Sequence, residues 1–175
     1  MEKNTNIWKN AMNWGFILGI ALIIYSLIIY FLGATFEKWA AYPTYLIMIA
    51  GIIYATIQYR DTMLDGSITY GKALGFGVLV MLFAGVISAV YTYVLYSFID
   101  PDLITKSLEV IEEEMINKGM ADEQIELALE MQSKFMKPGI LAILSIPGSA
   151  FAGFIISLFT SIFLKKEKID NPFGE

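Results

Sequence analysis

Residues 73–99 read ALGFGVLVMLFAGVISAVYTYVLYSFI and contain no aspartate, glutamate, lysine or arginine. A hydrocarbon core of about 30 Å is crossed by about 20 helical residues, because an α-helix rises about 1.5 Å per residue. This stretch is therefore long enough to cross a bilayer as one helix. Buried helices of soluble proteins are seldom this long and this free of charge.

Three further stretches share this character, at residues 10–36, 39–59 and 139–164. Hydrophobic residues make up 57% of the 175-residue chain and charged residues 17%, whereas a typical soluble domain is about 25% charged. We therefore predict an all-α membrane protein built as a four-transmembrane-helix bundle. Its organisation divides into residues 1–99 with three spans, an inserted segment at 100–138, and residues 139–175 with the last span and a basic tail.

The inserted segment is acidic and has the pattern of two amphipathic helices. Asp100-Pro101 ends the third span, and either Asp100 or Asp102 is expected to cap a new helix. Gly119 suits the end of this helix, and Asp122 can start a second one. Apolar or uncharged residues recur at helical spacing in both. The two stripes are Ile104, Leu108, Ile111 and Met115, then Ile125, Leu129, Gln132 and Met136.

We expect these helices to form an amphipathic hairpin outside the membrane. Its stripes can pack on each other, on the bilayer surface or on a partner. The run Glu112-Glu113-Glu114 raises the alternative of calcium binding. It lacks the alternating oxygen ligands of an EF-hand loop, so a solvated acidic face is the favoured interpretation.

The lysines and arginines predict the orientation. Four spans place both termini on one side, together with the loop that contains Arg60 and Lys72. Cations near span ends favour the cytoplasmic side, and Lys165, Lys166 and Lys168 directly follow the last span. Both termini are therefore expected in the cytoplasm, and the acidic hairpin is expected to be extracytoplasmic.

Composition also limits the chemistry. The chain has no cysteine, which excludes disulfides, thiolate metal sites and a cysteine nucleophile. It has no histidine either, so the commonest general base and metal ligand is missing. The net charge of −5 argues against nucleic-acid binding. We predict no cofactor, no metal site and no catalytic residue.

Two places are candidate functional sites. Arg60, Asp61, Asp65 and Lys72 lie in the loop between the second and third spans, where they can bind a lipid phosphate or a cytoplasmic partner. Anchoring of the span ends by the two cations is the favoured alternative. Asp65-Gly66 within the loop is a strong turn signal.

The second candidate is Pro147-Gly148 inside the fourth span, as a hinge or substrate site. A static kink is the favoured alternative, because membrane helices tolerate proline. Ser145 and Ser149 can satisfy backbone groups that the proline frees, such as the carbonyl of Ile143.

Small residues recur four apart in the spans, and such pairs let helices approach closely. Packing within one bundle is the economical explanation, and homodimerisation is the alternative. The pairs are Gly15 with Gly19, Gly51 with Ala55, Gly71 with Gly75, Gly148 with Ala152, and Ser149 with Gly153.

The stretch RDTMLDGSITYGKALGFG from Arg60 to Gly77, together with the four spans and the Asp-Pro-started acidic insertion, resembles one family. It is a family of bacterial inner-membrane proteins defined as domain of unknown function 4199. The resemblance covers nearly the whole chain. It implies a bacterial cytoplasmic-membrane location and supplies no activity, cofactor or catalytic residue.

Three functional hypotheses remain. The first is a non-enzymatic scaffold or accessory subunit of a cell-envelope assembly, in contact with membrane lipids, other membrane subunits or further copies of itself. The second is a small oligomeric carrier or channel for a lipid or small solute. The third and weakest is an enzyme acting on a lipid-linked substrate, with Asp61 or Asp65 as metal ligand or base.

Overall fold

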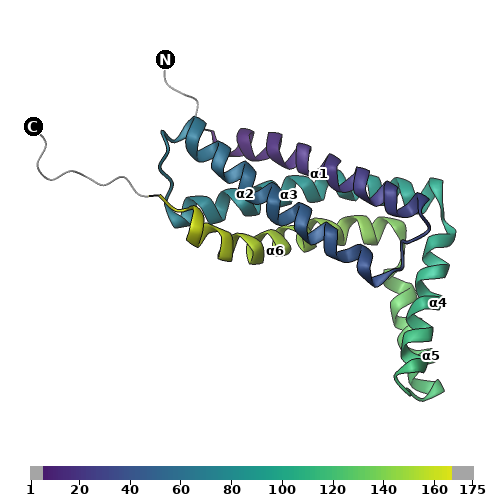
Figure 1. The fold of residues 1–175 in the computed structure, drawn as a ribbon. Helices are drawn as coiled ribbons and strands as arrows, with labels where there is room; N and C mark the ends of the chain where they lie inside the picture. The colour runs from purple at the N-terminus through teal and green to yellow at the C-terminus, as the bar shows by residue number, and fades with distance from the viewer. Residues whose placement is uncertain (1–5, 167–175) are drawn as a thin grey trace, which may run out of the picture.

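The computed structural model describes residues 6–166, which fold mainly into helices joined by short connections (Figure 1). Lys168, one of the three lysines used to predict the orientation, lies outside the described residues. The elements in chain order are α1 (Ile7–Phe31), η1 (Lys38–Ala40), α2 (Ala41–Met63), α3 (Tyr70–Val94), η2 (Leu95–Ile99), α4 (Asp102–Asn117), α5 (Asp122–Phe135) and α6 (Pro138–Leu164).

Four of the helices are long and apolar enough to cross a membrane, as predicted. They run alongside one another as a bundle, with the α4–α5 pair at one end (Figure 1). We call the end of the bundle that carries α4 and α5 the hairpin end; the α1–α2 connection also lies there. The opposite end, with the start of α1, the α2–α3 loop and the end of α6, is the termini end.

Helix α3 is the centre of the bundle. It packs most extensively against α6 and α1, and it also contacts α2. Phe76, Val80 and Met81 on α3 are completely or almost completely buried, as is Ile52 on α2. The Phe76 ring stacks on Tyr59 with ring centroids 4.3 Å apart. The other spanning helices expose large apolar side chains outward, which suits contact with lipid.

Glycines allow the close approach of α3 to its neighbours. A Cβ at Gly77 would collide with the Ser157 hydroxyl of α6, and one at Gly153 would collide with the Met81 side chain. A Cβ on Gly15 of α1 would lie 2.7 Å from the Val80 carbonyl oxygen. Packing within one bundle therefore accounts for Gly15 and Gly153, as predicted, and for Gly77, which was not among the predicted pairs.

The same explanation is wrong for other small residues. Gly71 and Gly75 of α3 and Gly148 of α6 have open space where a Cβ would be. Gly71 and Gly148 are exposed and Gly75 is half-buried, and an added Cβ at any of them would meet no heavy atom of a neighbour within 4 Å. Their lack of a side chain is thus not explained by packing of the single chain.

Helix α1 ends earlier than the charge-free stretch to residue 36. Gly33 has φ +68°, a backbone conformation that favours glycine. Its amide donates to Tyr30, and the Ala34 amide donates to Ile29, which is the Schellman pattern at a helix C-terminus. Gly33 is a local signal for this helix end, but the apolar stretch continues beyond it, so hydropathy alone predicted a longer span.

At the hairpin end, α3 continues into one π-helical turn, η2, where the Asp100 amide donates to the Leu95 carbonyl. The predicted caps are wrong. Pro101 occupies the N-cap position of α4, and no side chain caps it. The Asp100 carboxylate instead accepts a hydrogen bond from the Tyr30 hydroxyl of α1 at 3.2 Å. The side chain expected to cap α4 is therefore bonded to a helix distant in sequence.

The two predicted helices of the inserted segment are present as α4 and α5, which pack against each other. Gly119, at φ +73°, ends α4 through a second Schellman pattern, and α5 begins at Asp122 as expected. Ile125 is buried, and the other members of both predicted stripes are half-buried.

Helix α6 continues through Pro147 without a break. The Ser145 hydroxyl donates to the Ala142 carbonyl and the Ser149 hydroxyl donates to the Ser145 carbonyl, both at 2.7 Å. Neither hydroxyl therefore satisfies Ile143, contrary to expectation. Each makes a bond to its own preceding turn, which is the usual option for serine in a membrane helix.

Gly77 and Gly75 form a matched pair for testing this packing. We expect Gly77→Ala to destabilise the bundle by about 1–3 kcal/mol, because the added methyl overpacks the α3–α6 contact. For a chain of this size that lowers the unfolding temperature by about 2–10 °C. Gly75→Ala should change the unfolding temperature by no more than about a degree or raise it, because the added methyl meets open space. Thermal unfolding in mild detergent measures both, and equal shifts would contradict the packing described.

Candidate functional site

Arg60 at the termini end joins α2 to α6. Its guanidinium makes a bidentate ion pair with the neighbouring Asp61, at 2.7 and 3.2 Å. A third nitrogen donates to the Leu164 carbonyl at 3.3 Å. Since Leu164 is the last residue of α6, Arg60 satisfies one of the carbonyls that lack a helical partner there.

The α2–α3 loop is held against the end of α6 by backbone contacts. Asp65 and Gly66 both have positive φ, which confirms the predicted turn. Beyond the turn, Ile68 and Lys166 exchange two backbone hydrogen bonds of 2.8 and 2.9 Å. The Tyr70 hydroxyl also donates to the Leu158 carbonyl. These contacts fix the loop to the segment that follows α6.

The structure thus brings together only part of the predicted loop site. Arg60 and Asp61 form a pair, and Lys72 is exposed at the start of α3 without an ion pair to any residue described. The Arg60 side chain is 18% exposed and its contacts are internal. Its observed role is to connect helix ends, and no contact in the described chain assigns this loop a ligand.

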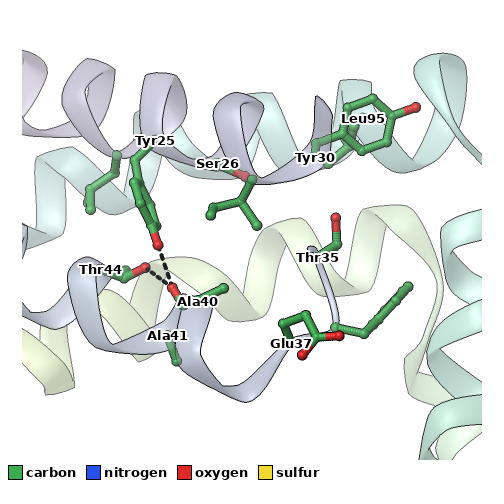
Figure 2. Close-up of a pocket in the computed structure, with 12 residues that line it drawn as sticks. Tyr25, Ser26, Tyr30, Thr35, Glu37, Ala40, Ala41, Thr44 and Leu95 are labelled. Atoms are coloured by element: carbon green, nitrogen blue, oxygen red, sulfur yellow. Dashed lines mark hydrogen bonds between the residues drawn. The ribbon is translucent and has the colours of Figure 1, made fainter. Parts of the chain in front are cut away.

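A pocket at the hairpin end was not predicted. It lies between α1 and the α1–α2 connection, with Leu95 of η2 also contributing, and has a volume of about 340 Å³ (Figure 2). Its walls combine apolar side chains with five hydroxyl-bearing ones and one carboxylate. The polar members are Tyr25, Ser26, Tyr30, Thr35, Thr44 and Glu37. Such a mixture of apolar walls and a few polar groups is typical of small-molecule sites.

Most of these hydroxyls have partners that hold them in place. The Tyr25 hydroxyl crosses from α1 to the Ala40 carbonyl at 2.7 Å (Figure 2). Ser26 shares a hydrogen bond of 3.2 Å with Tyr91 of α3. Because each bond joins two elements, the pocket is preformed by the packing of α1 against α2 and α3.

A second hollow, of about 480 Å³, adjoins the pocket and shares Tyr30, Thr35 and Phe36 with it. Asp100 and Lys106 also line it, and their charged groups lie 3.7 Å apart. The two hollows therefore share part of a wall, and together they are lined by two acids and a cation. Tyr30 lies between them and donates to Asp100.

An ion pair ties the hairpin to this region. Lys38 of η1 donates to the Glu114 carboxylate of α4 at 2.9 Å. The hydrogen bond and the charge of Lys38 lower the pKa of Glu114 below its ordinary value. Glu114 is therefore ionised at neutral pH and can hold α4 beside the α1–α2 connection.

The acidic hairpin contains a further hollow of about 370 Å³ between α4 and α5. Glu112, Asp122 and Glu126 line it with apolar neighbours. Within residues 6–166, no three acidic side chains are grouped closely enough to hold a metal ion. The positions of these acidic side chains therefore add no support for calcium binding beyond the negative charge of the hairpin.

Fold and site together define a class: a membrane protein with four spanning helices and a helical insertion before the last one. Residues 13–166 match the family model described as "Protein of unknown function (DUF4199)". The chain belongs to that family, as the Arg60–Gly77 resemblance implied. No curated protein and no solved structure matches the chain.

Removing the Arg60 guanidinium should loosen the junction between the loop and α6. In Arg60→Gln we expect hydrogen exchange at the Ile68 and Lys166 amides to accelerate roughly fivefold, since a hydrogen bond of about 1 kcal/mol is lost. Lys72→Gln removes a cation from the same region without breaking a described contact and serves as control. Exchange measured by mass spectrometry in detergent checks this, and unchanged rates in Arg60→Gln would refute the role given to Arg60.

Proposed function

We propose that the protein is a non-enzymatic, lipid-binding scaffold or accessory subunit of a cell-envelope assembly. Its ligand would be a phospholipid with an ammonium headgroup, bound in the pocket at the hairpin end. The observation that carries the proposal is the pocket's composition: apolar walls, five hydroxyl-bearing residues, and Glu37 as its charged lining residue.

The polarity of the pocket fits an amphiphile. Leu22, Ile29 and Leu95 offer an apolar wall to the first carbons of an acyl chain. Glu37 is exposed at the α1–α2 connection, where a span end meets the headgroup layer (Figure 2). A carboxylate at that depth attracts an ammonium group and repels an anionic headgroup.

The adjoining hollow supports the same ligand class. A phospholipid with an ammonium group is a zwitterion, so its phosphate also needs a positive partner. Lys106 lies in the adjoining hollow, where its side chain is 52% exposed and its ammonium is 3.7 Å from the Asp100 carboxylate. A lipid phosphate would bind the exposed side of this ammonium or replace Asp100 as its partner. Glu37 and Lys106 therefore place one charge of each sign in two adjoining hollows.

The carrier hypothesis receives less support. A ligand moving along the bundle axis would have to displace Phe76, Val80 and Met81, which fill the centre around α3. The buried polar side chains among the described residues are Thr56, Ser157 and Ser161, and none carries a charge. Intramembrane charges are the usual mark of ion-coupled transport.

The enzyme hypothesis is also weakened. Asp61 is engaged by both nitrogens of a bidentate Arg60 pair, so it is not placed as a base. Metal-assisted hydrolysis needs several grouped ligands, and the two loop aspartates do not form such a group.

The assembly is proposed to lie in the cytoplasmic (inner) membrane of a bacterium with both termini inside. The absence of cysteine in the chain makes this easy to test. In intact cells, a membrane-impermeant maleimide should label Glu113→Cys in α4 and should label Thr69→Cys in the α2–α3 loop only after the membrane is opened. Labelling of Thr69→Cys alone in intact cells would reverse the proposed orientation.

Lipid selectivity tests the proposed function. The purified protein in mild detergent is titrated with phosphatidylethanolamine or phosphatidylglycerol, and bound lipid is counted by native mass spectrometry. We expect phosphatidylethanolamine to bind more tightly. Glu37→Gln should weaken its binding by about three- to tenfold, as expected for loss of about 0.7–1.4 kcal/mol from a charge-assisted contact.

Two controls separate the pocket from general effects. Glu123→Gln removes an acid from the exposed start of α5 and should leave binding unchanged. Ala41→Phe should reduce binding because it places a ring in the pocket lining, whereas Leu46→Phe on the outward face of α2 should not. Equal binding of both lipids, unaffected by Glu37→Gln and Ala41→Phe, would refute the proposal.

A further inference from the structure

Helix α5 carries a second apolar stripe that α4 does not cover. Ile125 and Leu129 point toward α4, and Ile125 is 5% exposed. In contrast, Leu127, Met131 and Phe135 are 60%, 56% and 59% exposed. They recur every four residues and so form one line along the helix. Three large apolar side chains in line at the surface form a patch of the kind that marks a protein or membrane contact.

The position of the hairpin identifies that contact. The α4–α5 pair runs across the direction of the four spanning helices (Figure 1). An element that runs across the spans lies parallel to the plane of the bilayer. Only Met136 and Lys137 separate α5 from the first residue of α6, so Phe135 lies where α6 enters the membrane.

The exposed stripe ends close in sequence to the first turns of a spanning helix. Beyond the short connection, α6 exposes Ile143 and Leu144, which are 69% and 50% exposed. Exposed apolar side chains thus occur both on the first turns of a spanning helix and on the cross-running α5 that precedes it. A bilayer that surrounds α6 is therefore already present at the C-terminal end of the stripe.

Charge on α5 is arranged for an interface. Glu126 and Glu130 lie about a quarter to a third of a turn round the helix from the stripe, since successive residues are about 100° apart. Lys134 pairs with Glu130 at 2.9 Å, and Lys137 is exposed beside the membrane entry. The acidic face can remain in water while the apolar stripe meets the bilayer, as in other interfacial amphipathic helices.

The hairpin is also held in this position from the bundle side. The Lys38–Glu114 pair joins the far half of α4 to the α1–α2 connection. Asp100, at the start of the hairpin, is bonded to Tyr30 and Lys106. Of these contacts, Lys38–Glu114 and Tyr30–Asp100 join the hairpin to the bundle, and they oppose a swing of the hairpin away from it.

We propose that Leu127, Met131 and Phe135 seat the α4–α5 hairpin on the surface of the bilayer, with their side chains among the lipid headgroups and upper acyl chains. The hairpin then lies flat on the membrane and presents its acidic face to the aqueous side. This contact is independent of the pocket that binds the proposed phospholipid.

Spin labels on single cysteines test this in the full-length protein reconstituted into phosphatidylcholine vesicles. Oxygen concentrates in lipid and a nickel chelate stays in water, so their collision rates with the label report its surroundings. Labels at Leu127→Cys, Met131→Cys and Phe135→Cys should collide more with oxygen than with nickel. Labels at Glu126→Cys and Glu130→Cys, on the same helix, should show the reverse.

Other occupants give different results and overturn the proposal. If the stripe faces water, both sets of positions report nickel equally. If a second copy of the chain covers it, the stripe labels become shielded from both reagents and broaden by interaction between copies, which dilution with unlabelled protein removes. All five positions are exposed at the surface, so the substitutions leave the hairpin folded.

Discussion

The backbone of α3 lies so close to α1 and α6 that side chains are excluded at several crossing points. Gly77 and Gly153 serve the α3–α6 contact, and Gly15 serves the contact with α1. Hydrophobic burial does little to hold helices together in lipid, because the tails are as apolar as the side chains. Close van der Waals packing takes its place, so the arrangement of the whole bundle depends on these glycines.

That close packing leaves the helix ends to be completed by polar contacts. Arg60 supplies the last carbonyl of α6 with a donor, and the Ile68–Lys166 bridge joins the adjacent loop to the same segment. At the hairpin end, Tyr25, Ser26 and Tyr30 of α1 each bond to another element. Of these two ends, the hairpin end carries the pocket lined by Glu37 and the hollow that adjoins it. The functional proposals therefore concern the hairpin end.

The proposed lipid pocket and the apolar stripe of α5 are two separate features of the hairpin end. The pocket is formed by α1 and the α1–α2 connection, and its character comes from Glu37 and fixed hydroxyls. The stripe belongs to α5 and depends on the direction in which the hairpin leaves the bundle. Lys38 connects the two, because it precedes the pocket-lining Ala40 and binds Glu114 of α4. A lipid seated in the pocket would lie within the same headgroup layer as the hairpin.

The sequence by itself determined the four spans, the two helices of the insertion and the turns at Asp65-Gly66 and Gly119, because hydropathy, helical period and positive φ are local properties. The Arg60–Asp61 pair was also within reach, since the residues are adjacent. Tertiary structure alone decided that Arg60 reaches Leu164, that Tyr30 takes Asp100 from its expected cap, and that Gly77 is packed while Gly75 is not. These contacts join residues up to 104 positions apart. They depend on where two helices cross, and that crossing is fixed by packing along the whole length of α3.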